Sequence, residues 1–221
     1  MKQLVPGIIS LLLPVVATSQ VIALDDLQAL TPHGTVPELA AYQGRDAVRV
    51  VEEEGAEELL DKIVVVRGLD FANGSIEIAV AGMPQAGAAA GARGFVGIAF
   101  HVSPDGTEYE AFYLRPTNGR AEDQLRRNHS AQYIAHPEHT WRSLRESEPG
   151  MYESYVDLEP GAWTQMRVEV DGTTARLFVH GAEQPTLIVN DLKLGEGNGA
   201  IALWIDRGTE AYFSNLRVLP E

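Results

Sequence analysis

A segment in the middle of the chain concentrates side chains that could recognise a ligand. Arginine, asparagine, histidine, glutamine and tyrosine recur through residues 115–136. Planar donors of this kind form paired hydrogen bonds with carboxylates and hydroxyls, and flat rings stack on sugars. We therefore predict a ligand site here, the alternative being a long loop that its arginines pin to the domain. The residues of this segment and its flanks expected to bind substrate are His101, Tyr113, Arg115, Asn118, Arg126, Arg127, Asn128, Gln132 and Trp141.

Charge also distinguishes this segment. The chain has a formal charge of −14 at pH 7, which argues against nucleic acid or an anionic membrane surface as a partner, because both need a positive protein surface. Residues 115–145 nevertheless hold six arginines and only three acids. The local positive charge suits an acidic glycan.

Paired carboxylates suggest one kind of catalysis. Glu108 and Glu110 are two residues apart, and on a strand they would share a face with Cα atoms about 6.5–7 Å apart. Glu153 and Asp157 form a similar pair. A glycoside hydrolase uses two carboxylates on either side of the scissile bond, so this spacing permits hydrolysis.

Elimination is the alternative chemistry. A lyase acting on uronic acids needs a cation to neutralise the substrate carboxylate and a histidine or tyrosine to move the proton. Arg126 or Arg127, with His129 and Tyr133, would supply these groups. Across both mechanisms, the predicted catalytic residues are Glu108, Glu110, His129 and Tyr133.

The sequence predicts no metal. The absence of cysteine excludes thiolate ligands, disulfides and a cysteine nucleophile. His129, His136 and His139 are close in sequence, but they lack the fixed framework that zinc requires.

The N-terminus has the form of an export signal, residues 1–23. A lysine is followed by a short apolar stretch that two prolines interrupt, too short for a membrane span. Small residues then fit cleavage at either of two places, marked by Ala17 and Ser19 or by Val21 and Ala23. We therefore expect an exported protein, periplasmic or secreted, with no membrane span after cleavage.

The elements that must position the site residues are strands. Short apolar runs alternate with Gly, Pro, Asn and Asp, and Asp171-Gly172 supplies a tight hairpin turn. About ten strands at this spacing predict a β-sandwich or jelly roll. The expected strands are 46–52, 62–67, 75–81, 94–102, 108–115, 163–171, 174–180, 185–190, 199–205 and 211–218.

The hairpin of the expected strands 94–102 and 108–115 should lie under the site. If residue 101 pairs with residue 109 across the hairpin, one sheet face carries a polar and aromatic floor beneath the central segment. The side chains expected on that face are His101, Tyr109, Tyr113 and Arg115.

One domain, residues 45–221, is expected after an irregular arm of residues 24–44. Two stretches interrupt the strands. Residues 82–93 are rich in Gly and Ala and are predicted to form a flexible surface loop. Residues 116–162 show no strand pattern except a short run at 152–157. A loop of this length in a compact domain is usually functional or disordered, and its aromatic residues favour an ordered insertion.

The closing part of the chain is similar to a known family. The strings "RLFVHG", "GAIALW" and "FSNLRV" occur in this order within residues 163–218. They resemble the second half of laminin-G-like and 3-keto-disaccharide hydrolase-like domains, of the concanavalin A-like lectin/glucanase superfamily. The resemblance implies an all-β, two-sheet antiparallel sandwich of jelly-roll type with one long irregular insertion. By the same analogy, calcium would be bound by Asp70, Asn73 or Asp206.

Members of this superfamily bind, hydrolyse or eliminate glycans or serve as adhesive domains, so the resemblance implies an oligo- or polysaccharide partner. The Glu-x-Asp-x-Glu strand motif of laminarinase-like hydrolases is absent. We favour an exported glycan-recognising jelly roll of the glycoside hydrolase type. The alternatives are a non-catalytic carbohydrate-binding or adhesive module, a polysaccharide lyase on an acidic glycan, and a periplasmic structural partner without a small ligand. Apart from calcium, no cofactor is expected.

Overall fold

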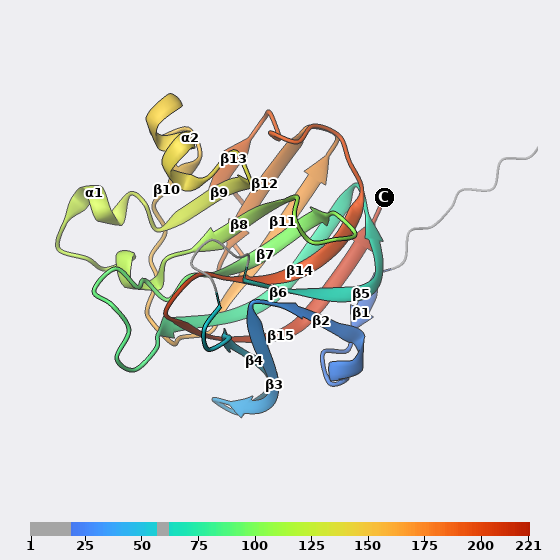
Figure 1. Ribbon diagram of the computed structural model, residues 1–221. Helices are drawn as coiled ribbons and strands as arrows, with labels where there is room; N and C mark the ends of the chain where they lie inside the picture. Colours follow the sequence, from blue (N-terminus) through green and yellow to red (C-terminus); the bar gives the residue numbers. More distant parts are fainter. Residues whose placement is uncertain (1–18, 57–61) are drawn as a thin grey trace, which may run out of the picture.

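The chain folds into two antiparallel sheets packed face to face (Figure 1). The computed structural model describes residues 19–56 and 62–221. Residues 1–18, which hold most of the predicted export signal, lie outside the described residues. The predicted sandwich is confirmed. None of the helices in the described ranges has the length and apolar character needed to cross a membrane.

One sheet has eight strands. Its order is β13-β12-β11-β6-β15-β4-β3, and β1 pairs with β15 beside β4. The bounds are β1 (Gln20–Ile22), β3 (Thr35–Tyr42), β4 (Arg45–Glu52), β6 (Gly74–Pro84), β11 (Thr164–Asp171), β12 (Thr174–Val179), β13 (Leu187–Val189) and β15 (Thr209–Pro220).

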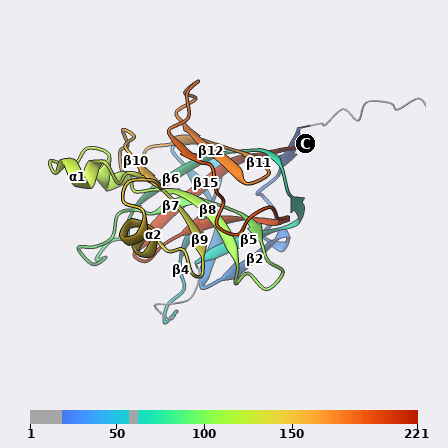
Figure 2. The same ribbon diagram turned by 90° about the horizontal axis from the view of Figure 1, so that it is seen from above.

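The other sheet has seven strands in the order β10-β9-β8-β7-β14-β5-β2. Its strands are β2 (Leu30–His33), β5 (Ile63–Phe71), β7 (Val96–Val102), β8 (Tyr109–Leu114), β9 (Ala131–His136), β10 (Glu153–Ser154) and β14 (Gly199–Ile205). Short helices occupy the connections: η1 (Leu27–Ala29), η2 (Pro116–Asn118), α1 (Gln124–Arg127) and α2 (Trp141–Ser147). Both α1 and α2 lie at the end of the sandwich away from the C-terminus (Figures 1 and 2).

The core lies between the sheets and follows the two-residue period of the strands. On β14 the side chains of Ile201, Leu203 and Ile205 are fully buried between the sheets. The neighbouring strand β7 adds Ile98, which pairs with Leu203. Because both sheets bury one face in this way, the apolar runs of the sequence were sufficient to indicate the sandwich.

The N-terminal arm, which the sequence analysis predicted to be irregular, contains regular strands. Residues 30–42 form β2 and β3, which extend one edge of each sheet. The buried Thr35 hydroxyl donates to the Ile63 carbonyl at 3.0 Å, and the Tyr42 hydroxyl donates to the Gly161 carbonyl at 2.8 Å. Edge strands bury fewer side chains than central ones, so the sequence pattern of this segment was too weak to reveal them.

The central insertion also contains a regular strand. β9 pairs with β8 along its whole length, from Tyr109 opposite His136 to Leu114 opposite Ala131. Five of its six residues are buried, so polar and apolar residues do not alternate along it. A strand covered on both faces lacks the period that sequence analysis searches for.

The Gly/Ala-rich stretch is shorter as a loop than predicted. β6 continues to Pro84. Near its end the backbone of Gly82 packs so closely on the loop that a Cβ there would lie 2.3 Å from the Gly94 carbonyl oxygen. Gly94 itself has φ +69° and sits against the backbone of Met83, a conformation that favours glycine. These two glycines hold the loop of residues 85–95 close to β6 and fix where it returns to β7.

Candidate functional site

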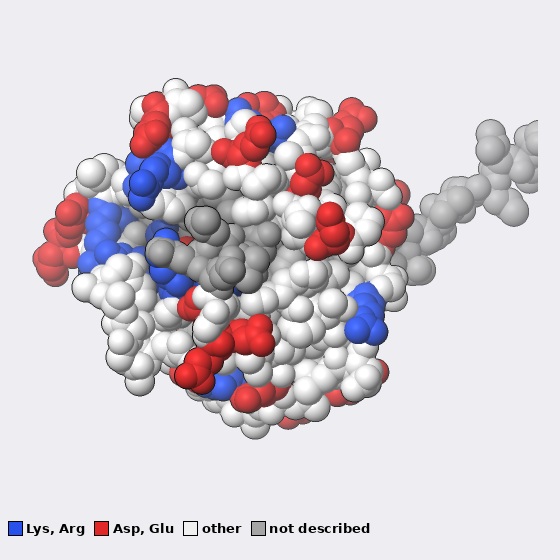
Figure 3. Space-filling model, viewed as in Figure 1, with Lys and Arg blue, Asp and Glu red and all other residues white. Residues whose placement is uncertain are grey.

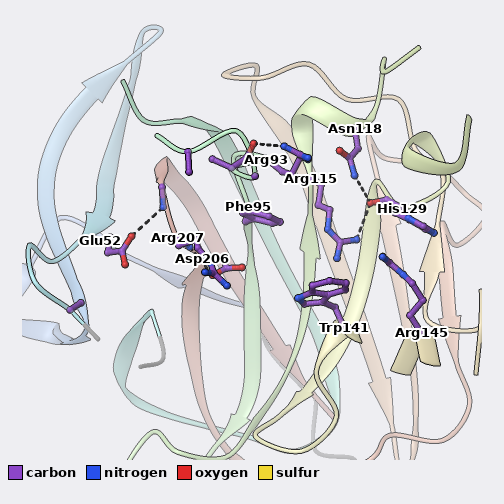
Figure 4. A pocket seen from close by; sticks show the side chains of 15 residues that line it. Glu52, Arg93, Phe95, Arg115, Asn118, His129, Trp141, Arg145, Asp206 and Arg207 are labelled. Atoms are coloured by element: carbon purple, nitrogen blue, oxygen red, sulfur yellow. Dashed lines mark hydrogen bonds between the residues drawn. The ribbon is translucent and has the colours of Figure 1, made fainter. Parts of the chain in front are cut away.

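A cavity of about 660 Å³ opens at the end of the sandwich that carries the two α-helices. It is bounded by the end of β4, the loop before β7, η2, α2 and the turn between β14 and β15. Figure 4 shows that the labelled side chains surround one space, with Phe95 and Arg93 between an arginine-rich side and a side that carries carboxylates. Loops from both sheets therefore build one site.

The floor of this cavity is aromatic. The ring of Tyr113 stacks on Trp204 with centroids 4.4 Å apart, and Phe95 meets Tyr113 edge-on at 6.1 Å. Arg115 donates to the Tyr113 hydroxyl at 2.7 Å. Burial raises the pKa of Tyr113 above its usual value. Tyr113 and Arg115 thus lie beneath the insertion, where the hairpin register predicted them.

Three arginines form the positive side. Arg93 donates to the carbonyls of Ala90 and Ala92 at 2.7 and 3.0 Å, and Arg126 donates to Asn118 and Thr117. Within the described part of the chain, neither arginine forms an ion pair with a carboxylate. The pKa of Arg93 is lowered by burial and then by the charges of Arg126 and Arg115. The three guanidinium groups therefore lie close together, and Arg115 alone of the three pairs with a carboxylate of the described residues.

Glu153 pairs with Arg115, the third of these arginines, and with Arg145, which also lines the cavity. Its buried carboxylate accepts two hydrogen bonds from Arg145 Nε, at 3.0 and 3.1 Å, and lies 3.6 Å from Arg115 Nη1. His129 Nε2 is 3.2 Å from the same carboxylate. The pKa of His129 is lowered, mainly by burial, although Glu153 opposes this. Glu153 therefore fastens α2 to β10 and acts as structure around the cavity.

Trp141 supplies an apolar wall at the start of α2. The helix begins after Thr140, whose hydroxyl accepts from the Ser143 amide as an N-cap. The Trp141 ring lines the cavity and packs in part on the core. Arg145 lies over the ring with its guanidinium carbon 4.9 Å from the centroid. The ring is thereby held at the cavity edge in the manner of a stacking surface.

Carboxylates lie on the opposite side. Glu52 accepts from the Gly208 amide at 3.1 Å and pairs with Lys62 at 3.3 Å. Asp206 accepts from the amide of Arg207 at 2.7 Å. Both carboxylates line the cavity together with Arg207, so a ligand here would meet mainly arginines on one side and both acceptors and a cation on the other.

The structure brings together only part of the predicted site. The predicted residues that line the cavity or contact its lining directly are Arg115, Asn118, Arg126, His129 and Trp141. Gln132 lies below them, where its carbonyl oxygen accepts from Arg115. Arg127 and Asn128 turn outward, to Tyr155 and Gln124 respectively. Their proposed binding roles stay predictions.

The predicted carboxylate pair is separated. Glu108 is exposed and precedes β8, whereas Glu110 lies within β8 and is fully buried between the sheets. Tyr133 is buried with it and donates to Glu110 at 2.9 Å. Since both face the core, they lie on the other side of the sheet from the cavity that His129 lines. Their catalytic roles remain untested predictions, without a shared site in this conformation.

His101 is not on the face that the hairpin register suggested. The pairing of Phe100 with Glu110 agrees with that register. However, the β14–β7 ladder shifts by one residue between Ala200 and Ala202, and His101 adopts φ +52°. Such a bulge re-aims a side chain. The His101 ring therefore lies 3.8 Å from Glu110, not beside Tyr113.

Sequence reasoning missed the cavity residues outside the central insertion. These include Arg93, Phe95, Glu52 and Asp206. One signal was available: Arg93 is the only charged side chain in the Gly/Ala-rich stretch 82–95. A lone charge in a segment otherwise without charged side chains is consistent with a binding role.

The residues suggested for calcium do not form one ligand set. Asp70 and Asn73 line a recess elsewhere on the domain, while Asp206 lines the main cavity. The Asp70 carboxylate accepts from Asn198, and the Asn73 side chain accepts from the Gly172 amide. No group of three or more acidic or histidine side chains able to hold a metal occurs within residues 19–56 and 62–221. The donor set does not fit calcium.

Surface charge follows the same division. Figure 3 shows several Lys and Arg side chains at the end of the molecule that carries α1 and α2, with acidic groups at the tip of that end and around the rest of the face. A positive region on a chain of net charge −14 would attract an anionic ligand locally.

Comparison with known proteins supports the fold. No protein-family model matches the sequence, and no curated protein matches it. Among solved structures, carbohydrate-binding module CBM66 from Bacillus subtilis is 10% identical and has a TM-score of 0.54, covering 85% of this chain and 96% of its own. A Bacillus subtilis protein of unknown function with a galectin-like fold is 11% identical with a TM-score of 0.56, over 89% and 91%. A native glycosidic hydrolase is 11% identical with a TM-score of 0.53, over 94% and 98%. The predicted resemblance is thus confirmed at the level of the fold, a two-sheet β-sandwich that these solved structures share.

Proposed function

We propose that the cavity binds an acidic oligo- or polysaccharide. The observation that carries this proposal is the group of three arginines, Arg93, Arg115 and Arg126, of which only Arg115 pairs with a carboxylate among the described residues. A buried or half-buried cation is costly unless it is paired. A uronate carboxylate or a sulfate at this position would supply the missing negative charge through paired hydrogen bonds.

The apolar parts of the cavity favour a sugar over a smaller anion. Trp141 and Phe95 offer ring surfaces of the kind that pack on sugar faces, and Asp206 and Glu52 offer acceptors for hydroxyl groups. A cavity of about 660 Å³ is large enough for more than one sugar unit. The solved structures of similar fold include a carbohydrate-binding module and a glycosidic hydrolase, which supports the same ligand class.

The proposed function is ligand binding, and catalysis is a separate property that the same experiment measures. Hydrolysis needs two carboxylates beside the scissile bond, and those that line the cavity are Glu52 and Asp206 rather than Glu108 and Glu110. Export, the setting in which such a polysaccharide would be met, is proposed from the N-terminal sequence.

The test is calorimetric titration with a uronic-acid oligosaccharide and with the same oligosaccharide after its carboxyl groups are reduced to alcohols. We expect the acidic form to bind at least about tenfold more tightly, and the difference to shrink at high salt. Equal affinities would overturn the acidic specificity, and no binding of either form would overturn the carbohydrate proposal. Mass spectrometry of the same mixtures reports any hydrolysis or elimination product.

A further inference from the structure

A second polar cluster lies in the core, away from the cavity. Glu110 Oε1 accepts hydrogen bonds from the Tyr133 hydroxyl and from the Leu194 amide, each at 2.9 Å. The Tyr133 oxygen in turn accepts from the Lys193 amide at 2.8 Å. Glu110 and Tyr133 thereby bind the backbone of two consecutive residues in the loop between β13 and β14.

The second oxygen of Glu110 faces His101. Its Oε2 and the His101 Nδ1 are 3.8 Å apart, and neither atom has a hydrogen-bond partner among the described residues. His101 Nε2 lies 2.8 Å from the Ala72 carbonyl oxygen. Because a carbonyl only accepts, Nε2 must carry a hydrogen. In the neutral imidazole Nδ1 is then an acceptor, and it faces another acceptor if Glu110 is ionised.

Two buried acceptors facing each other leave two unsatisfied polar atoms, which costs stability. One proton removes both defects. We propose that Glu110 is protonated in the folded protein and that its Oε2–H donates to His101 Nδ1, so that one buried proton completes the network holding Lys193 and Leu194. A displacement of about 1 Å brings the two atoms to hydrogen-bond distance.

The surroundings favour this neutral pair over an ion pair. From β9 the group facing Glu110 is the Tyr133 hydroxyl, from β7 it is His101, and from the β13–β14 loop they are the two backbone amides. Among the described residues, only His101 comes within ion-pair distance of Glu110. Burial raises the pKa of Glu110 to about 7 and lowers the pKa of His101, because both charged forms are poorly solvated there.

The hydrogen-bond network around Glu110 also contributes to the position of α2. The loop that Glu110 holds carries Lys193, whose ammonium group donates to Glu148 at 3.0 Å and to Asp191 at 2.7 Å. Glu148 is the C-terminal cap of α2, the helix that presents Trp141 to the cavity. The bonds from Tyr133 and Leu194 to Glu110 Oε1 therefore also support α2, at the end remote from Trp141.

The sign of the pH effect follows from the raised pKa. Between the ordinary carboxyl pKa and about 7, the folded protein binds this proton and the unfolded chain does not. The stabilisation is complete below the ordinary value and is lost as the pH rises through about 7. Ionised Glu110 above that range keeps its two donors on Oε1 but leaves Oε2 unsatisfied.

The test compares Glu110→Gln with the parent chain in denaturant unfolding from pH 4.5 to 8.5. A glutamine amide can donate to His101 and still accept at its oxygen, so it imitates the protonated acid. We expect the denaturant midpoint of the parent chain to fall relative to that of the variant as pH rises through about 7. Thr35→Val is the control, since it removes a buried hydrogen bond to the Ile63 carbonyl, in which no titrating group takes part, and should lower the midpoint by the same amount at every pH.

A constant difference between Glu110→Gln and the parent chain would overturn the proposal. If the glutamine variant does not fold, carbon NMR of the Glu110 carboxyl in the parent chain decides the question. A titration midpoint near 7 supports the buried proton, and a midpoint at or below the ordinary glutamate value refutes it.

Discussion

Replacing Arg93 with glutamine separates a ligand-binding arginine from a structural one. Among the described residues, the side chain makes hydrogen bonds only to the carbonyls of Ala90 and Ala92, within its own loop. Burial lowers the pKa of Arg93, and the charges of Arg126 and Arg115 lower it further. Removing this charge deletes a cation from the cavity but breaks no ion pair of the described chain.

The expected loss of affinity can be worked from these contacts. A hydrogen bond to a charged group contributes about 1.5–3 kcal/mol, and about 1.4 kcal/mol is a factor of ten in Kd. Since Arg93 is partly exposed, the lower end applies, and we expect a roughly tenfold weaker binding of a uronic-acid oligosaccharide. Folding stability should be unchanged or slightly higher, because repulsion from the two neighbouring arginines is relieved.

The assay is calorimetric titration at two salt concentrations, with thermal unfolding of the same samples. Arg67→Gln is the matched control, an exposed arginine on β5 that donates to the Thr31 hydroxyl and does not line the cavity. Weaker binding with an unchanged melting temperature in Arg93→Gln supports the reasoning. An unchanged Kd refutes it, as does a large fall in melting temperature, which would make Arg93 structural.

Three further predictions concern other parts of the molecule. Trp141→Ala should weaken oligosaccharide binding about tenfold in calorimetry, from the loss of a stacking surface; unaltered affinity would contradict the proposed wall. Glu153→Gln should destabilise the domain by about 3 kcal/mol in denaturant unfolding, because Arg145 loses its buried partner; a loss below about 1 kcal/mol would show that the pair is dispensable. After export, mass spectrometry should find Gln20 at the N-terminus, since β1 pairs with β15 and the alternative cut would remove it; a chain starting at Leu24 would contradict this.

The sequence was sufficient for the sandwich because central strands repeat apolar residues with a period of two and end at glycine turns. It was insufficient for β9, which is buried on both faces, and for β3, whose edge position leaves Val36 and Leu39 exposed. In each case burial depends on neighbours that are distant in the chain. The local pattern carries no record of them.

The cavity lies in the region where the sequence analysis predicted a site, but its lining differs from the predicted set of residues. Arg115, Asn118 and Trp141 meet in the cavity because β8, η2 and α2 end there. Glu110 was separated from Glu108 by the start of β8, and His101 was turned by a one-residue bulge. A bulge changes the face of a side chain without changing the composition of its strand, so sequence spacing could not show it.

The tether of the Gly/Ala-rich loop has an evolutionary consequence. Gly82 and Gly94 fix the two ends of the loop against β6 and β7, while the residues between them bear little of the core. Insertions, deletions and changes of charge in this segment should therefore have little effect on folding stability. Selection could exchange Arg93 for a neutral or acidic residue and alter ligand preference in few mutational steps. The loop is accordingly where we expect descendants of this domain to diverge first.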